Sequence, residues 1–288
     1  MTPSFRLMGI VNATPDSFSD GGRFLDPRKA VDHALALIDQ GAAILDVGGE
    51  STRPGAEPVA AAEELGRVLP VVEGIASAIA DAEADTGGAQ ISIDTSKASV
   101  ARAALAAGAS LVNDVSALRA DPEMASLVAE SGAECCLVHM QGEPRTMHRD
   151  PHYEDVVDEV KAFLQERLEF ALSAGIEERH VLLDPGIGFG KTVEHNLALL
   201  ARLAELAELG RPLVIGTSRK SFLARVAQAP PDSDRLAGTL ATNVLALERG
   251  ASVFRVHDVA PAREALAVAA ATLSGRWTAS AQGTTRTT

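Results

Sequence analysis

The feature that most constrains the fold is the regular return of short apolar segments, separated by longer stretches of helical period. Short, continuously apolar runs are typical of strands buried on both faces. The intervening stretches, such as 26–40 and 97–107, carry apolar residues three and four apart, which predicts amphipathic helices. The eight predicted strands are 7–11, 44–47, 91–93, 111–112, 135–138, 181–183, 213–215 and 252–256. This order predicts an α/β fold, a (β/α)8 TIM barrel with its active site at the carboxyl ends of the strands. A doubly wound open sheet is the alternative.

The chain length of 288 residues fits one such barrel. Gly-Ala pairs at 41–42, 108–109, 132–133 and 250–251 each follow a predicted helix and precede the next strand, as expected of helix stops. We expect a single domain over residues 1–275. Residues 276–288 are rich in Thr, Ser, Ala and Gly without any period, which predicts a disordered tail.

Charge and cysteine content exclude several classes of protein. With 26 Lys and Arg against 39 Asp and Glu, the formal net charge is −13, so the chain lacks the basic surface that nucleic acids and anionic membranes require. It has no apolar run long enough for a membrane span and no sign of a signal peptide. The two cysteines, Cys135 and Cys136, are adjacent in an apolar run, which predicts inert core thiols rather than a disulfide framework. These features predict a cytoplasmic protein.

Polar residues follow nearly every predicted strand. In a parallel barrel these strand ends meet at one face, where such barrels build their active sites. A single Asp, Asn or Ser there could simply cap the next helix, but capping does not explain cations beside carboxylates. The residues concerned are Asn12, Asp46, Asp94, Asn113, Asp114, His139, Asp184, Ser218, Arg219, Lys220, Ser221, Arg255 and His257.

These residue types divide by chemistry. The cations Arg53, Arg219, Lys220 and Arg255, with His257, could hold a phosphate-like anion. Asn12 and nearby Asp residues offer hard oxygen ligands, suited to magnesium carried in with a phosphate. Asp94, Asn113 and Asp184 could read the donor edge of a heterocycle lying across the barrel mouth.

Two sets of residues resemble a phosphate-binding loop and a metal site, but their spacing supports neither. Residues 186–192 (GIGFGKT) resemble a phosphate loop, but the spacing is wrong, because the residue at the place of the first glycine is Pro185. Four histidines could be metal ligands, yet none are spaced i, i+4 on a helix, and no cysteine pair supports them. These are His139, His148, His152 and His195, and we expect satisfied or surface side chains.

Eight segments taken in order resemble those of the dihydropteroate synthases, pterin-binding barrel enzymes of folate biosynthesis. The resemblance covers about residues 6–259. The segments are 8–22 (MGIVNATPDSFSDGG), 46–56 (DVGGESTRPGA), 92–95 (SIDT), 112–116 (VNDVS), 139–142 (HMQG), 184–191 (DPGIGFGK), 218–220 (SRK) and 255–258 (RVHD).

The resemblance implies a transferase that joins 6-hydroxymethyl-7,8-dihydropterin diphosphate to 4-aminobenzoate, giving 7,8-dihydropteroate and diphosphate. It implies Mg²⁺ as cofactor, bound by Asn12, and a homodimer as the assembly; sulfonamides should compete as aminobenzoate mimics. The implied catalytic residues are Asp20, Arg53, Lys220, Arg255 and His257. The implied ligand contacts are Asp94, Asn113, Asp184, Lys220, Met140 and Gly216 for pterin, Asn12, Arg53, Arg255 and His257 for diphosphate, and Phe18, Thr52, Pro54, Phe189 and Ser221 for aminobenzoate.

Two other functions remain open at this point. A methyltetrahydrofolate–corrinoid methyltransferase would share the pterin-reading Asp and Asn, but has no reason to keep residues 218–220 or the long first loop. A pterin-binding paralogue without activity would keep the barrel. The joint presence of Asn12, Asp20, Arg53, Lys220, Arg255 and His257 argues against it.

Overall fold

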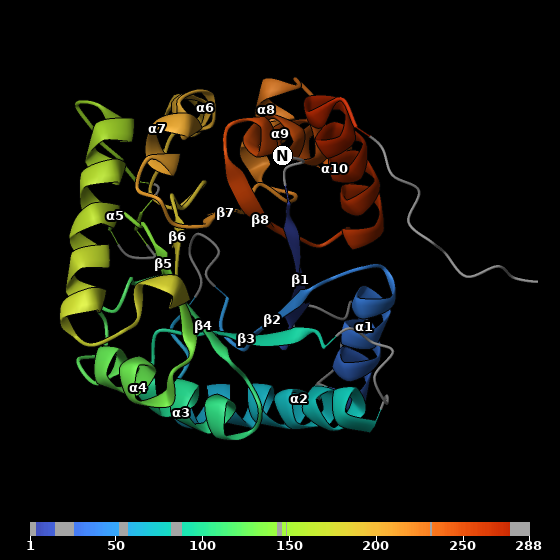
Figure 1. Cartoon of the computed structure of the whole chain (residues 1–288), viewed down its shortest axis with the longest axis vertical. Coiled ribbons are helices and arrows are strands. Elements are labelled where there is room, and N and C mark those ends of the chain that lie inside the picture. The colour runs from blue at the N-terminus through green and yellow to red at the C-terminus, as the bar shows by residue number, and fades with distance from the viewer. Residues whose placement is uncertain are drawn as a thin grey trace, which may run out of the picture.

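The chain forms a closed barrel of eight parallel strands that pair in chain order, β1 to β8, with β8 closing against β1 (Figure 1). The computed structural model describes residues 4–14, 26–51, 57–81, 88–142, 146–147, 149–230 and 232–276. The strands are β1 (Arg6–Asn12), β2 (Ile44–Gly48), β3 (Gln90–Asp94), β4 (Leu111–Asp114), β5 (Glu134–Val138), β6 (Val181–Asp184), β7 (Leu213–Ile215) and β8 (Ala251–Val256). The predicted (β/α)8 fold is confirmed, and the open sheet is wrong.

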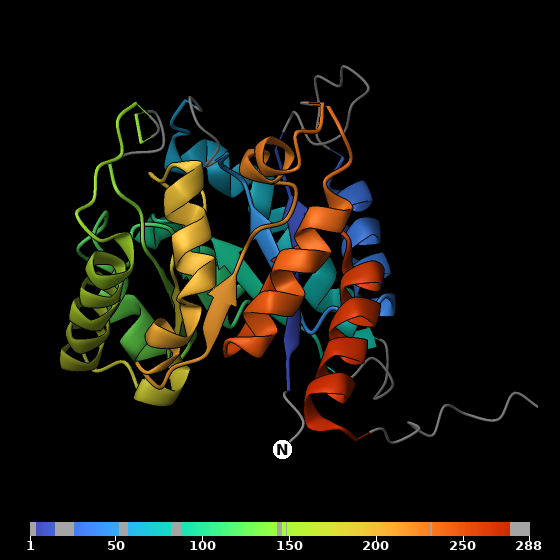
Figure 2. The same ribbon diagram turned by 90° about the horizontal axis from the view of Figure 1, so that it is seen from above.

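The helices form a ring outside the strands (Figures 1 and 2). They are α1 (Pro27–Asp39), α2 (Ala61–Asp81), α3 (Ala98–Ala106), α4 (Met124–Ser131), α5 (Val156–Ser173), α6 (Val193–Ala201), α7 (Leu203–Ala207), α8 (Ser221–Val226), α9 (Leu236–Glu248) and α10 (Val259–Ser274), with a short 3₁₀ turn, η2 (Glu178–His180). Among these described helices, none is long and apolar enough to cross a membrane. Of the predicted tail, residues 277–288 lie outside the described part of the chain.

The start of α3 is capped by a residue outside its own local sequence. Thr95 and Ser96 precede this helix and resemble capping residues, but Lys97 occupies the N-cap position and makes no side-chain cap. The Thr95 hydroxyl accepts from the Lys97 amide at 3.3 Å instead. The first helical amide, that of Ala98, donates to the Asp121 carboxylate at 2.8 Å. A residue distant in sequence therefore caps the helix.

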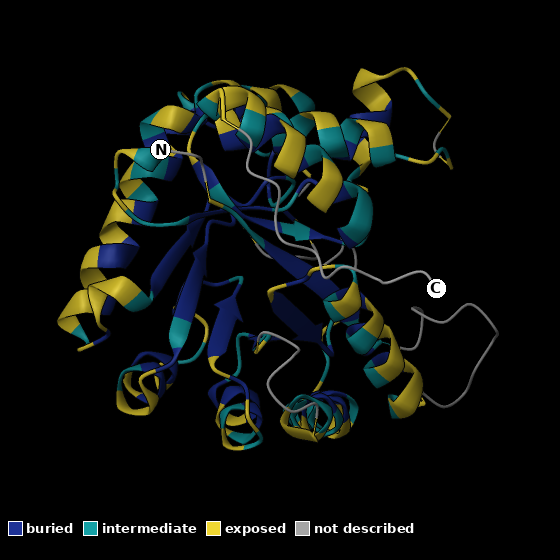
Figure 3. Ribbon diagram, turned by 45° about the vertical axis from the view of Figure 1, so that its right-hand side comes forward, coloured by how far each residue is buried: buried dark blue, intermediate teal, exposed yellow. Residues whose placement is uncertain are grey.

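The alternation of side chains along each strand divides the core in two. The larger part lies between strands and helices and contains Leu7, Leu45 and Cys135. The smaller part fills the barrel, where Met8, Ile44 and Cys136 come together. Figure 3 shows the buried strands surrounded by helices that are buried on one side and exposed on the other. Burial raises the pKa of the Cys135 thiol to about 12, so the prediction of an inert core thiol is confirmed.

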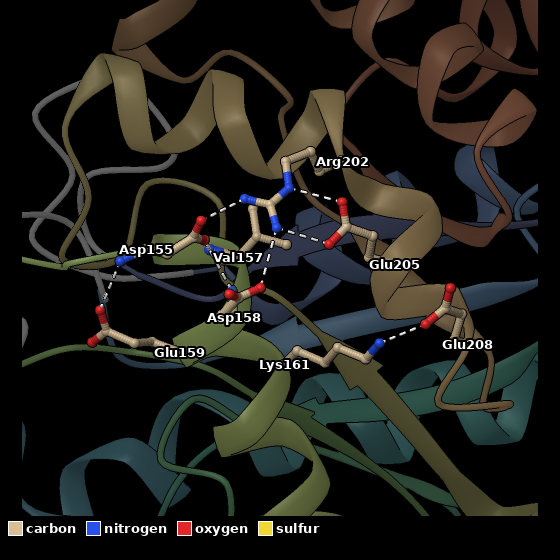
Figure 4. Close-up of polar contacts among 8 residues, drawn as sticks. All are labelled: Asp155, Val157, Asp158, Glu159, Lys161, Arg202, Glu205 and Glu208. Carbon is tan, nitrogen blue, oxygen red and sulfur yellow. Dashed lines mark hydrogen bonds and ion pairs between the residues drawn. The ribbon is translucent and has the colours of Figure 1, made fainter.

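Ion pairs on the outer surface connect α5 with α6 and α7 (Figure 4). Arg202, between α6 and α7, donates to Asp155 at 2.6 Å and to Glu205 at 2.8 Å. Asp155 is also the N-cap of α5, where it accepts from the amide of Val157 at 2.8 Å. Lys161 on α5 separately pairs with Glu208 at 2.6 Å. Exposed pairs of this kind contribute little to stability individually.

Candidate active site

The two-residue repeat in side-chain direction along a strand brings polar side chains to the mouth of the barrel. A side chain two residues further along a strand points to the same face. The inward apolar residues Ile44, Leu111, Leu182 and Val253 are each followed, two positions later, by a polar residue. These are Asp46, Asn113, Asp184 and Arg255. The same strand geometry that fills the barrel with apolar side chains thus sets a charged layer above them.

Asp46 is the centre of that layer; the sequence placed it at a strand end but indicated no role for it. Its side chain is fully buried and accepts from the hydroxyl of Ser92 at 2.6 Å. It also accepts from Nδ2 of Asn113 at 3.1 Å and from Nε of Arg255 at 2.6 Å. Because the amide nitrogen of Asn113 is engaged here, its carbonyl oxygen is left to accept from a ligand. Asp46 therefore orients two of the predicted binding groups.

The guanidinium of Arg255 bridges the carboxylates of Asp46 and Asp94. Its Nη2 donates to Oδ2 of Asp94 at 2.8 Å. Burial and the negative charge of Asp46 raise the pKa of Asp94 to about 7, while the charge of Arg255 acts in the opposite direction. Gly48 lies beside this group, and a Cβ there would come within 3.4 Å of the Asp94 Cβ. Glycine at position 48 keeps the space above Asp94 open.

Asp184 ends β6 and is 7% exposed. Its Oδ1 accepts from the amide of Gly186 at 2.7 Å, which fixes the carboxylate and leaves lone pairs for a ligand. Burial raises the pKa of Asp184, and the charge of Lys220 lowers it. Gly186 has a φ of +65°, and a Cβ there would meet the carbonyl oxygen of His139 at 1.8 Å. Only glycine permits this approach.

Lys220 lies against the loop that follows β6. Its Nζ donates to the carbonyl oxygen of Ile187 and lies 4.6 Å from the centre of the Phe189 ring. Burial lowers the pKa of Lys220 to about 8, although the charge of Asp184 opposes that shift. The structure brings together two residues from separate motifs, Lys220 and Phe189, which the resemblance assigns to pterin and to aminobenzoate. The ammonium lies over the ring face, as in a cation–π contact.

The same loop is built around a second lysine. The side chain of Lys191 is buried, and its Nζ lies 3.0 Å from the carbonyl oxygens of Gly186 and Phe189 and 2.8 Å from Nδ1 of His139. Burial and the charge of Lys191 lower the pKa of His139 to about 2, so its ring is neutral. The expectation of a satisfied histidine at position 139 is confirmed. Lys191 serves the loop structure, in agreement with the rejection of a phosphate loop.

A further buried group lies behind the loop that follows β2. Lys97 donates to Glu64 at 2.6 Å and also to Glu50, and Glu64 is fully buried. The other oxygen of Glu50 accepts from the amide of Val59 at 3.1 Å. Glu50 belongs to the segment 46–56, so this cluster joins that segment to α2 and to the end of β3. No sequence spacing indicated this arrangement.

The remaining predicted site residues lie around the mouth. Asn12 ends β1 and is half-buried, His257 follows β8, and Gly216 follows β7. Met140 follows β5 and is 8% exposed, and Ser221 is the exposed first residue of α8. Phe18, Asp20, Thr52, Arg53 and Pro54 lie outside the described residues, so their roles stay predictions. In the described part of the chain, no group of three or more His, Cys, Asp or Glu side chains could hold a metal by itself.

Comparisons with known proteins agree with this geometry. The model of the pterin-binding enzyme family matches residues 8–257. The chain is 47% identical over 270 residues to dihydropteroate synthase of Escherichia coli, covering 94% of this chain and 92% of that protein. The fold is similar to dihydropteroate synthase of Xanthomonas albilineans with 4-aminobenzoic acid, with a TM-score of 0.85, 46% identity and 94% of each chain covered. It is also similar to the Yersinia pestis enzyme in complex with a sulfonamide drug, with a TM-score of 0.86, 43% identity, and 95% and 96% of the two chains covered.

Proposed function

The chain belongs to the pterin-binding enzyme family as a dihydropteroate synthase, a transferase of folate biosynthesis, and on that premise we propose which of its side chains carry each part of the reaction. The reaction joins 6-hydroxymethyl-7,8-dihydropterin diphosphate to 4-aminobenzoate and releases diphosphate. The mouth of the barrel has to hold three chemically different groups: a heterocycle, a benzoate and a diphosphate. The described residues divide into three sets accordingly.

The pterin set is Asp94, Asn113 and Asp184, with Lys220, Met140 and Gly216 around them. The amino-pyrimidinone edge of a pterin presents N–H donors, which two carboxylates and one amide oxygen can accept. Asp184, held by Gly186, makes a charge-assisted pair of bonds to that edge. Met140 and Gly216 supply an apolar contact and open space for the flat ring.

The aminobenzoate set centres on Lys220, Phe189 and Ser221, and the prediction for Phe18, Thr52 and Pro54 is retained. The ring of Phe189 offers a face for the benzoate ring; Lys220 Nζ lies 4.6 Å from its centre, and the charge of Asp184 opposes the lowering of the Lys220 pKa by burial. Ser221 at the start of α8 is exposed beside them. A sulfonamide, as in the complex of the Yersinia pestis enzyme, should compete for the same place.

The diphosphate set is Asn12, Arg255 and His257, with Arg53 retained from the sequence prediction. The absence of a metal cluster from the described residues fits a Mg²⁺ ion that brings most of its ligands with it as phosphate oxygens and water. Asn12, a hard oxygen donor at the end of β1, would hold that ion. When bound, the ion would neutralise charge on the leaving group.

The chemistry needs orientation more than acid or base catalysis. The amine nitrogen of aminobenzoate attacks the pterin methylene carbon, the carbon–oxygen bond breaks, and diphosphate leaves with the bonding electron pair. The amine then loses one proton. Since an aromatic amine is unprotonated near neutral pH, no strong general base is required. Arg255 and His257 stabilise the charge that appears on diphosphate, and the predicted Asp20 would stabilise the cation-like methylene.

One observation carries these assignments: Asp94 and Asp46 share the guanidinium of Arg255. This arrangement orients the pterin-reading carboxylate and the diphosphate-binding cation as a unit. Replacing Asp94→Asn should lower the affinity for dihydropterin diphosphate by roughly ten-fold or more in calorimetric titration, because a charge-assisted bond is lost. The matched control is Asp39→Asn at the exposed carboxyl end of α1, which should bind like the wild type. Wild-type affinity in Asp94→Asn would contradict the assignment.

The assembly and compartment follow as part of the same proposal. We infer a homodimer formed through α9 and α10, whose outer face exposes Leu245, Val268 and Leu273, the second of them 68% exposed. Such an apolar face on neighbouring helices is typical of a protein contact. Sedimentation of Val268→Glu should give a monomer, and an unchanged dimer would contradict this interface. Two buried, free cysteines support a reducing, cytoplasmic setting.

A further inference from the structure

The loops after β7 and β8 contact each other through two consecutive pairs of residues. Ser218 meets His257, and Arg219 meets Asp258. Nε of Arg219 donates to the Asp258 carboxylate at 3.0 Å, on the exposed side of the pair. Arg219 has a φ of +57°, a left-handed conformation that turns the chain between Ser218 and Lys220. The outer pair ties the loops together, and the inner pair touches the proposed diphosphate site.

The hydroxyl of Ser218 contacts His257 twice. Its Oγ accepts from the backbone amide of His257 at 3.1 Å and lies 3.0 Å from Nδ1 of the ring. Ser218 is 6% exposed, and among the described residues Nδ1 is the acceptor within reach of its hydroxyl proton. A serine hydroxyl has one proton to donate, and Nδ1 can accept it when the ring carries no proton there. A neutral ring that accepts at Nδ1 has its proton on Nε2.

We propose that Ser218 is a positioning residue whose hydroxyl donates to Nδ1 of His257 and holds the ring as the Nε2–H tautomer, so that the ring donates a hydrogen bond to an oxygen of the departing diphosphate. This inference rests on the assignment of His257 to diphosphate under the proposed function. The other neutral tautomer would direct a lone pair from Nε2, which repels an anion. The choice of tautomer thus decides whether the imidazole assists or opposes departure of the leaving group.

The hydroxyl is held from behind by helix α9, independently of any substrate. The hydroxyl of Thr217, the residue before Ser218, lies 2.8 Å from the hydroxyl of Thr242 and donates to the side chain of Asn243 at 3.2 Å. The amide of Arg219, the residue after it, donates to the hydroxyl of Thr239 at 3.2 Å. Both neighbours of Ser218 are therefore fixed to one helix. A donor set in place before the reaction needs no reorganisation as charge develops.

Nitrogen NMR on the full chain, labelled with ¹⁵N-histidine, tests the tautomer directly. In the wild type, Nδ1 of His257 should be unprotonated and Nε2 protonated. Ser218→Ala should give a mixture of the two tautomers, and Ser218→Thr, which restores a hydroxyl, should restore the wild-type spectrum. Ser126→Ala removes an exposed hydroxyl on α4 that bonds the carbonyl of Glu123 and does not contact His257, and it should leave the tautomer unchanged. A wild-type ring protonated at Nδ1 would overturn the proposal.

Kinetics test the consequence for the reaction. Ser218→Ala should lower kcat by roughly ten-fold with little change in KM for aminobenzoate, because the lost donor acts on the leaving group in the transition state. Ser218→Thr should recover most of kcat. An unchanged kcat in Ser218→Ala, despite mixed tautomers, would refute the positioning role.

Inorganic diphosphate with Mg²⁺ separates this inference from the function on which it rests. Its addition to the wild type should move the His257 Nε2 signal. If that signal does not move while the tautomer is as expected, His257 does not contact diphosphate. Its proposed role as a hydrogen-bond donor to the leaving group is then wrong as well. The Ser218–His257 geometry would then stand as a structural contact alone.

Discussion

The replacement Lys191→Met is the sharpest test of how the loop after β6 is held. Lys191 and methionine are similar in length, so the variant removes the nitrogen and keeps most of the volume. The wild-type Nζ contacts two carbonyl oxygens, of Gly186 and Phe189, and the Nδ1 of His139. In the variant the Gly186 carbonyl keeps its bond from the Phe189 amide at 3.0 Å, while the Phe189 carbonyl and Nδ1 of His139 lose the donor that Lys191 supplied. Each such group costs about 1–3 kcal/mol.

The expected loss of stability is smaller than the upper end of two such costs. Burial lowers the pKa of Lys191 well below its ordinary value, which means that the wild type bears a desolvation penalty that the variant escapes. We therefore expect the free energy of unfolding to fall by about 3 kcal/mol, at the lower end of the range for breaking a buried charged group. Urea unfolding followed by circular dichroism measures it.

Lys161→Met is the matched control. This lysine makes one ion pair, with Glu208 at 2.6 Å, on the outer surface of α5 (Figure 4). Because exposed pairs contribute between 0 and about 1 kcal/mol, the control should lose less than 1 kcal/mol. Equal losses in the two variants would refute the argument that Lys191 organises the loop. Lys191→Met should also raise KM for aminobenzoate, because the carbonyl of Phe189 loses its partner.

Three further results are expected. Asp184→Asn should weaken binding of dihydropterin diphosphate by roughly ten-fold or more in calorimetric titration, since it removes the charge from a paired contact, and wild-type binding would refute that placement. Lys220→Ala should raise KM for both substrates, because its Nζ lies 4.6 Å from the Phe189 ring and its charge interacts with that of Asp184, and unchanged kinetics for both would remove it from the site. The pH profile of kcat/KM for the pterin should be bell-shaped. Asp94, with a pKa raised to about 7, must be ionised and loses its charge as pH falls; Lys220, with a pKa lowered to about 8, must be protonated and loses its charge as pH rises. A profile that is flat between pH 6 and 9 would contradict both roles.

The sequence predicted the barrel because its signals are local. Short apolar runs define strands, and a polar residue after each run is carried to the mouth by the two-residue period of the strand. Asp94, Asn113, Asp184 and Arg255 all lie there for this reason. Their common place in the fold follows from each residue's own strand, without knowledge of its contacts.

Local signals of this kind could not predict which side chains from different strands contact each other. Asp46 and Arg255 are 209 positions apart, and their contact depends on closure of the barrel through β1; Lys191 and His139, 52 apart, meet because β5 and β6 are neighbours. The signal for Asp46 was its place at the end of a predicted strand, the same signal that picked out Asp184. The cap of α3 is likewise non-local, because Asp121 comes from the next loop of the barrel.

Diphosphate release from dihydropterin diphosphate and Mg²⁺, measured on the purified protein with and without 4-aminobenzoate, tests the central claim most directly. The account predicts release that depends on aminobenzoate, with 7,8-dihydropteroate formed in equal amount. Tight binding of the pterin diphosphate without release in the presence of aminobenzoate would contradict it and identify a pterin-binding protein without this activity.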